Sequence, residues 1–315
     1  MCGIIAYSGS KDSLSLLIKG LSRLEYRGYD SSGVAIVSPD GLFVEKKSGK
    51  LSVLKDTLKG KTIDGEVGIG HTRWATHGVP NDANAHPHLN ADSKFALVHN
   101  GIIENYVQIK DDLVSLGVKF SSETDTEVVV QKLAQEWSGD LLNTTLTVAK
   151  ELRGTYALVV VSEFEPGTIV AGRMMSPLVM GVGDGEMFLA SDASAIIEHT
   201  DKMIFLENGD FVKIQGGDYE LFDIKGEKVM REVETVDWEI EDAEKGGHEH
   251  YMYKEIIEQP ESIRNTLSER IDGDFFTSEF QIDRDKALNY KKIWIVACGT
   301  AYHAGLFGRE LFEKS

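Results

Sequence analysis

A cysteine stands at position 2, directly after the initiator methionine. Removal of Met1 would leave a thiol and a free α-amine on the same residue. An α-amine titrates at about 7.7–8.0 and a thiol near about 8.5, so the amine can accept the thiol proton at neutral pH without a histidine. Cys2 therefore has the chemistry of a self-activated nucleophile for acyl transfer. The simpler alternative is that this free cysteine is a small apolar residue at the start of a strand.

The polar groups that such a nucleophile needs follow two apolar runs further along the chain. Residues 71–78 hold a guanidinium, two hydroxyls and two imidazoles, and the forked N–H groups of Arg73 can bind a carboxylate. Asn100 and Gly101 pair a side-chain amide with a backbone N–H that a substrate can approach closely, as an oxyanion hole requires. Asp125 lies at the start of a predicted helix, where interaction with the helix dipole explains a carboxylate equally well.

Alternating and helical spacings predict the elements that position these residues. Residues 3–7 form an apolar run typical of a buried strand, and the leucines of residues 14–24 recur at helical spacing. Short apolar runs at 34–37 and 42–44 flank a Pro-Asp-Gly turn, which predicts a hairpin. Further strands are predicted at 66–71, 95–99, 156–162, 168–171 and 187–190. Helices are predicted near 107–116 and 126–137, the second of them with a capping box formed by Thr124 and Glu127.

The spacing of these elements predicts layers of sheet packed on sheet and covered by helices up to about residue 235. Residues 236–250 are acidic and contain glycine, which is typical of a connector between domains. Residues 291–300 form a continuous apolar run that ends in Gly-Thr, and residues 301–312 have helical character. We expect a strand followed by a helix there, as at the opening of a parallel α/β domain. Because one strand and one helix cannot bury a two-sided sheet, we expect this second domain to be truncated.

The composition excludes several classes of function. The 315 residues are 42% hydrophobic and 27% charged, with a net charge of −18. Nucleic acids and anionic membranes bind clustered positive charge, so neither is an expected partner. The two cysteines lack a CxxC spacing, and no apolar stretch approaches the roughly 18 residues of a membrane helix. We expect a cytoplasmic protein that is not exported and that acts on small molecules.

The motifs around these residues resemble the family of glutamine:fructose-6-phosphate aminotransferases (isomerising), the glucosamine-6-phosphate synthases. They include CGI at 2–4, RLEYRGYDS at 23–31, HTRWATHG at 71–78, NAHPH at 84–88, HNGIIEN at 99–105, SETDTE at 122–127, LRGTY at 152–156, HYM at 250–252 and CGT at 298–300. The resemblance implies an α+β fold, the four-layer αββα sandwich of N-terminal-nucleophile hydrolases. It implies a glutaminase domain at 2–235, an interdomain linker with a helical segment at 236–290, and the truncated start of a sugar isomerase (SIS) domain at 291–315.

The resemblance also implies a role for each polar residue. Cys2 would attack the carboxamide carbon of glutamine, with its own α-amine as base and then as acid. Asn100 and the N–H of Gly101 would stabilise the tetrahedral oxyanion. Arg73 would bind the substrate α-carboxylate, and Asp125 would bind its α-ammonium group.

Five further residues are implied around that pocket. Thr76 and His77 would complete it, and His86 and Arg27 would shape its closed state. Trp74 resembles the family's gate on a channel that carries ammonia to the sugar site. No cofactor and no metal are predicted.

The resulting expectation is a chain that hydrolyses glutamine but does not make glucosamine 6-phosphate. The full-length protein would convert fructose 6-phosphate and L-glutamine to glucosamine 6-phosphate and L-glutamate, as a homodimer. One alternative is the glutaminase domain of another amidotransferase of the same class, such as an amidophosphoribosyltransferase. Another is a non-catalytic glutamine-binding regulatory module, which retention of Met1 would favour. A metal site on His86 and His88 is the weakest alternative, since no cysteine or carboxylate lies at ligand spacing with them.

Overall fold

The computed structural model describes residues 2–75, 78–236, 248, 250–268, 271–272, 275–276 and 289–314. It divides into two compact units, Met1–Gly246 and Gly247–Ser315. In the described part of the chain, no helix combines the length and the apolar character needed to cross a membrane. The expected connector at 236–250 lies almost wholly outside the described residues.

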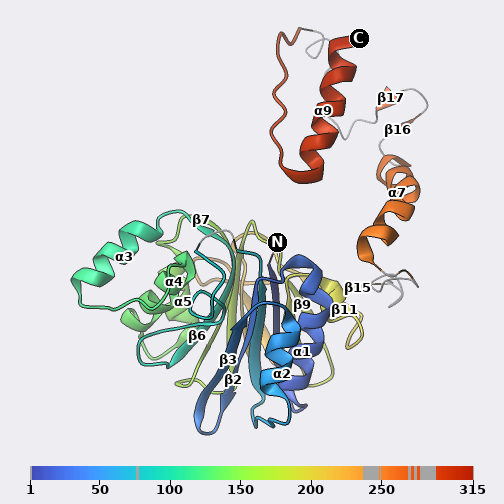
Figure 1. Ribbon diagram of the computed structural model, residues 1–315. Coiled ribbons are helices and arrows are strands. Elements are labelled where there is room, and N and C mark those ends of the chain that lie inside the picture. The colour runs from blue at the N-terminus through green and yellow to red at the C-terminus, as the bar shows by residue number, and fades with distance from the viewer. Residues whose placement is uncertain are drawn as a thin grey trace. The chain divides into compact units, whose positions relative to one another are not determined.

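Two antiparallel sheets form the first unit (Figure 1). Sheet A has the strand order β15-β11-β9-β10-β1-β4-β2-β3 and sheet B the order β14-β13-β12-β8-β7-β6-β5. The strands of sheet A are β1 (Gly3–Ser8), β2 (Ser31–Ser38), β3 (Gly41–Ser48), β4 (Val67–Arg73), β9 (Val179–Val182), β10 (Met187–Ala190), β11 (Lys202–Phe205) and β15 (Glu234–Thr235). Those of sheet B are β5 (His88–Leu89), β6 (Phe95–Ile103), β7 (Gly154–Ser162), β8 (Thr168–Met174), β12 (Phe211–Gln215), β13 (Asp218–Phe222) and β14 (Lys228–Val229).

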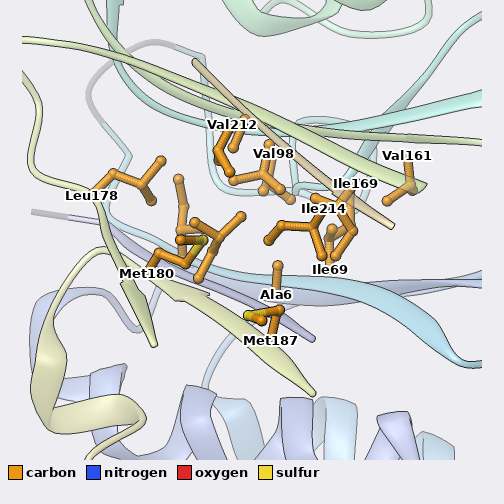
Figure 2. Packing of buried hydrophobic residues seen from close by; sticks show 14 of the residues in the cluster. Ala6, Ile69, Val98, Val161, Ile169, Leu178, Met180, Met187, Val212 and Ile214 are labelled. Atoms are coloured by element: carbon orange, nitrogen blue, oxygen red, sulfur yellow. The ribbon is translucent and has the colours of Figure 1, made fainter. Parts of the chain in front are cut away.

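The largest core lies between the two sheets, whose facing side chains interdigitate (Figure 2). Strand β7 shows how one run of apolar residues serves two cores, because successive side chains of a strand point to opposite faces. Val159 and Val161 belong to the core between the sheets. Leu158 and Val160 belong to the core on the other face of sheet B. The apolar strands are therefore buried on both sides, which is why they lack polar alternation.

Helices cover the outer face of each sheet (Figure 1). Helices α1 (Ser13–Leu24) and α2 (Leu51–Leu58) pack on sheet A through leucines such as Leu17, Leu21 and Leu54. Helices α4 (Asp125–Gln135) and α5 (Leu141–Ala149) pack on sheet B, and α3 (Tyr106–Ser115) packs against α4. The layers run helix, sheet, sheet, helix, so the predicted αββα sandwich is confirmed for this unit. Two short 3₁₀ turns, η1 (Glu25–Arg27) and η2 (Ala193–Ala195), complete it.

The described residues of the second unit contain α7 (Tyr251–Ser268), β16 (Ile271–Asp272), β17 (Phe275–Phe276) and α9 (Gly299–Lys314). Helix α9 agrees with the helix predicted at 301–312. The strand predicted at 291–300 is wrong, because residues 292–298 are irregular and the helix begins at Gly299. A strand exists only through hydrogen bonds to a neighbouring strand, and no described strand pairs with this apolar run.

Candidate active site

Pairing between β1 and β4 brings the thiol of Cys2 next to the end of β4. Gly3 lies opposite Thr72 in this ladder, so Cys2 reaches the residues that follow Arg73. The Cys2 Sγ accepts a hydrogen bond from the Trp74 N–H at 3.2 Å. Burial raises the pKa of the Cys2 thiol, against the opposing effects of the Trp74 N–H, the chain's N-terminal charge and Arg73. The site therefore favours a neutral thiol until a base takes its proton.

An aspartate fixes the turn that carries Trp74. The N–H of Asp30 donates to the Arg73 carbonyl at 3.0 Å, and the Asp30 Oδ2 accepts from the Ala75 N–H at 2.7 Å. These two hydrogen bonds hold the residues on either side of Trp74. The position of the Trp74 N–H that meets the thiol is thus set by the residue that precedes β2 as well as by β4.

Asn100 and Gly101 reach the same place from β6 of sheet B. The Asn100 Nδ2 donates to the backbone oxygen of Cys2 at 3.1 Å. Gly101 has a φ of +131°, and a Cβ atom built on it would lie 2.0 Å from the Thr155 oxygen of β7. Only glycine fits this backbone without strain. The site is therefore assembled from both sheets, with the thiol on one and the amide on the other.

A cation and a carboxylate complete the polar lining. Arg73 is buried at the end of β4, and its Nη2 donates to the Gly78 oxygen at 3.4 Å. Burial lowers the pKa of Arg73, against the opposing charges of Cys2, Asp30 and Asp125. Asp125 is the first residue of α4, and its Oδ2 accepts from the Ile103 N–H at 2.8 Å. Charges of both signs thus flank the thiol, as an amino acid substrate would require.

The N-terminus of α4 places Asp125, and its cap differs in part from the predicted capping box. Thr124 is the N-cap residue, and its Oγ1 accepts from the Glu127 N–H at 3.3 Å. The Glu127 carboxylate does not return this bond. It accepts instead from the N–H groups of Ser121 and Ser122 at 2.8 and 2.6 Å. The carboxylate therefore holds the loop that leads into the helix.

These groups surround one small cavity. It is lined by Cys2, Arg73, Trp74, His86, His99, Gly101, Thr124, Asp125 and Thr126. Six of these residues were singled out from the sequence as site residues. His99, Thr124 and Thr126 were not, although each stands next to a residue that was. Their position beside Asn100 or Asp125 in the sequence motifs was the signal that could have identified them.

Three of the predicted site residues, Thr76, His77 and Arg27, are not part of this arrangement. Thr76 and His77 lie outside the described residues. The Arg27 Nη2 donates to the Asp192 Oδ2 at 2.5 Å, and Arg27 does not line the cavity. Trp74 does line the cavity, but it is 43% exposed, and its ring makes an edge contact with Tyr29 at 5.2 Å between centroids. An indole that is only half covered has room to change its position.

Buried histidines lie behind the cavity. The rings of His71 and His86 are 4.1 Å apart between centroids, and those of His86 and His88 are 4.7 Å apart. Burial lowers the pKa of His71 to about 3 and that of His86 and His88 well below the usual value. They are therefore neutral at physiological pH. Among the residues that the structure describes, no group of histidine, cysteine and carboxylate side chains is arranged to hold a metal ion.

Comparison with known proteins gives a family match and long relatives. Residues 55–234 match the family model described as a glutamine amidotransferase domain. A Thermus thermophilus protein named glutamine-fructose-6-phosphate aminotransferase (isomerizing) is 48% identical over 313 residues, 99% of this chain and 52% of that protein. The Clostridium acetobutylicum protein of the same name is 46% identical over 316 residues, 100% of this chain and 52% of that protein. The chain spans about half the length of these curated relatives.

A solved structure has the same arrangement of layers. The glutamine phosphoribosylpyrophosphate amidotransferase of B. subtilis, complexed with ADP and GMP, superposes with a TM-score of 0.63 at 22% sequence identity. The match covers 71% of this chain and 49% of that chain. At this identity the likeness supports the fold.

Proposed function

The chain belongs to the glutamine amidotransferase family, and we propose that it hydrolyses L-glutamine to L-glutamate and ammonia with Cys2 as the nucleophile. The observation that carries this proposal is the meeting of the two sheets at Cys2. Cys2 precedes β1 of sheet A, and Asn100 lies on β6 of sheet B. The Asn100 Nδ2 donates to the backbone oxygen of Cys2, so an amide that can stabilise an oxyanion lies beside the residue that carries the thiol.

Removal of Met1 starts the mechanism, because it frees the α-amine of Cys2. The amine takes the thiol proton as Sγ attacks the carboxamide carbon of glutamine. The carbon–nitrogen bond then breaks, the amine returns the proton to the leaving ammonia, and a γ-glutamyl thioester remains. Water attacks the thioester carbon while the amine accepts its proton. The carbon–sulfur bond breaks, glutamate leaves, and the proton returns to the thiol.

The charged groups of the cavity orient the substrate for this attack. Asn100 Nδ2 and the Gly101 N–H stabilise the oxyanion in each tetrahedral state. Arg73 binds the α-carboxylate and Asp125 the α-ammonium group. His86 contributes to the wall of the pocket, and Trp74 gates its exit. Thr76 and His77 complete the pocket, and His86 and Arg27 shape its closed state.

The full-length protein uses the ammonia for amino sugar synthesis in this proposal. The relatives that match nearly the whole chain are named for glutamine and fructose 6-phosphate, which supports these two substrates and glucosamine 6-phosphate as product. Residues 2–235 form the glutaminase domain, 236–290 the linker with a helical segment, and 291–315 the start of a SIS domain that would carry the contact of a homodimer. The two unpaired cysteines fit a reducing cytoplasm.

Release of glutamate and ammonia from L-glutamine by the purified chain tests the glutaminase proposal, with intact mass recording whether Met1 is absent. Cys2→Ala should abolish release. Cys298→Ala is the matched control, since it removes the other free thiol, which is exposed in the second unit, and it should leave release unchanged. Release that persists in Cys2→Ala, or no release from protein that lacks Met1, would contradict the proposal.

A further inference from the structure

We propose that His71 is a positioning residue that holds the Asn100 side-chain amide with its nitrogen toward Cys2, an inference that rests on the function proposed above. His71 lies on β4 of sheet A and Asn100 on β6 of sheet B. The His71 ring therefore joins the two sheets through its contacts with His99 and Asn100.

The contacts of one ring nitrogen determine which way the amide faces. The His71 Nε2 lies 3.1 Å from the His99 backbone oxygen and 3.0 Å from the Asn100 Oδ1. A backbone carbonyl can only accept, so Nε2 must carry the hydrogen. An N–H group requires an acceptor at the Asn100 contact as well. The amide oxygen must therefore face His71, which leaves the amide nitrogen to face Cys2.

The surroundings hold His71 in this neutral form. The ring is buried, and burial lowers its pKa to about 3. Its Nδ1 has no hydrogen-bond partner among the described residues, so nothing there stabilises a proton on that atom. The ring of His86 lies 4.1 Å away, tilted by 32°, and restricts the rotation of the His71 ring. His71 is thus a fixed donor over the working pH range of a cytoplasmic enzyme.

A gap in the sheet B ladder explains why imidazoles occupy this place. Pairing of β5 with β6 ends at His88 opposite Leu97, so His99 lies beyond it. There the His86 Nδ1 accepts from the His99 N–H at 3.3 Å, and the His71 Nε2–H donates to the His99 oxygen. Two side chains thus replace the missing strand. The second of them also reaches Asn100.

The orientation matters because the two ends of the amide have opposite effects on an oxyanion. With Nδ2 toward Cys2, the amide donates to the negative oxygen of the tetrahedral state. With the amide reversed, Oδ1 would face that oxygen and repel it, while two donors would meet at His71. Loss of the His71 donor removes the bias between these orientations. Turnover should fall while substrate binding through Arg73 and Asp125 is retained.

Paired substitutions test this role. His71→Leu removes the donor and should lower kcat for glutamine hydrolysis by about tenfold to a hundredfold, with KM changed by less than about threefold. His71→Gln places an amide nitrogen near the former Nε2 and should restore most of kcat. In an Asn100→Ala background, His71→Leu should change kcat by less than about twofold, because the amide that it positions is absent. His199→Leu, which removes a histidine stacked on Phe188, should leave kcat unchanged.

Three outcomes would overturn the proposal. His71→Leu could lower kcat equally in the wild-type and Asn100→Ala backgrounds, or His71→Gln could have a kcat no higher than that of His71→Leu. The third is that the loss of kcat/KM in His71→Leu comes wholly from a rise in KM. Nitrogen-15 NMR of histidine-labelled protein gives a test that needs no activity. His71 should be neutral with Nε2 protonated, and protonation at Nδ1 would refute the assignment. Failure of the wild-type chain to hydrolyse glutamine would count against the proposed function and leave the NMR result to decide the position of the amide.

Discussion

The first unit should lose stability as the pH falls from 7.5 to 5.5, because it buries neutral histidines. In the folded chain, burial lowers the pKa of His71 to about 3 and that of His86 and His88 well below the usual value. In the unfolded chain each titrates near about 6.5. Below pH 6.5 the unfolded state therefore binds more protons than the folded state, and the free energy of unfolding decreases as the pH falls. For His71 the loss continues down to about pH 3.

The size of the effect follows from the distance to the unfolded pKa. At pH 5.5, one pH unit below that value, keeping His71 neutral in the folded chain costs about 1 kcal/mol, and His86 and His88 change stability in the same direction. Urea unfolding at constant ionic strength, at pH 7.5, 6.5 and 5.5, measures the change. His71→Gln removes one of these groups, so the variant should lose about 1 kcal/mol less stability than the wild type between pH 7.5 and 5.5.

A non-titrating core variant separates this linkage from general weakening. Leu189 is fully buried between the sheets. Leu189→Ala should lower the free energy of unfolding by about 2–5 kcal/mol, and this decrease should be similar at each pH. The same pH dependence in His71→Gln and in the wild type would refute the reasoning, since it would mean that His71 takes up a proton in the folded chain as readily as in the unfolded one.

Three further predictions concern the cavity. Arg73→Ala should raise KM for glutamine by roughly 10- to 150-fold, which corresponds to about 1.5–3 kcal/mol for a charge-assisted contact. Asn100→Ala should mainly lower kcat. Steady-state kinetics distinguish the two variants, and equal effects of both on KM and kcat would argue against these roles. Gly101→Ala should lower the free energy of unfolding by about 1–3 kcal/mol and should lower kcat. The reason is the positive φ of Gly101 and the 2.0 Å distance from an added Cβ atom to the Thr155 oxygen of β7. An unchanged melting temperature and kcat would be inconsistent with that strain. Thr124→Ala should cost about 1 kcal/mol through loss of the N-cap and should raise KM by displacing Asp125; Thr124→Ser, which keeps the hydroxyl, should restore both.

Local pattern was enough to predict most of the elements that build the sandwich. Residues 3–7, the leucine face of residues 14–24 and the Pro-Asp-Gly hairpin all appear at the predicted places. Each depends on side-chain periodicity or on turn chemistry within a few residues. The run at 291–300 shows the limit of that signal. Its apolar residues suit a strand, but a strand also needs a partner, which no local pattern specifies.

The site was predictable as a set of residues and less so as a geometry. Cys2, Arg73, Gly101 and Asp125 line one cavity, and their catalytic roles stay predictions until they are assayed. The contact of Arg27 with Asp192 joins residues 165 positions apart. That of His71 with Asn100 crosses from one sheet to the other. Such pairs follow from strand order and register, which the spacing of residues along the chain does not contain.

The alternation of the chain between its two sheets has a consequence for synthesis. The chain enters sheet B after β4, returns to sheet A after β8, and changes sheet again after β11 and β14. Neither sheet is therefore complete until nearly all of the first unit has left the ribosome. The long separations between paired strands also favour slow folding. Cys2 precedes in the sequence every strand that builds its site, so the thiol has no competent site until the later strands have paired around it.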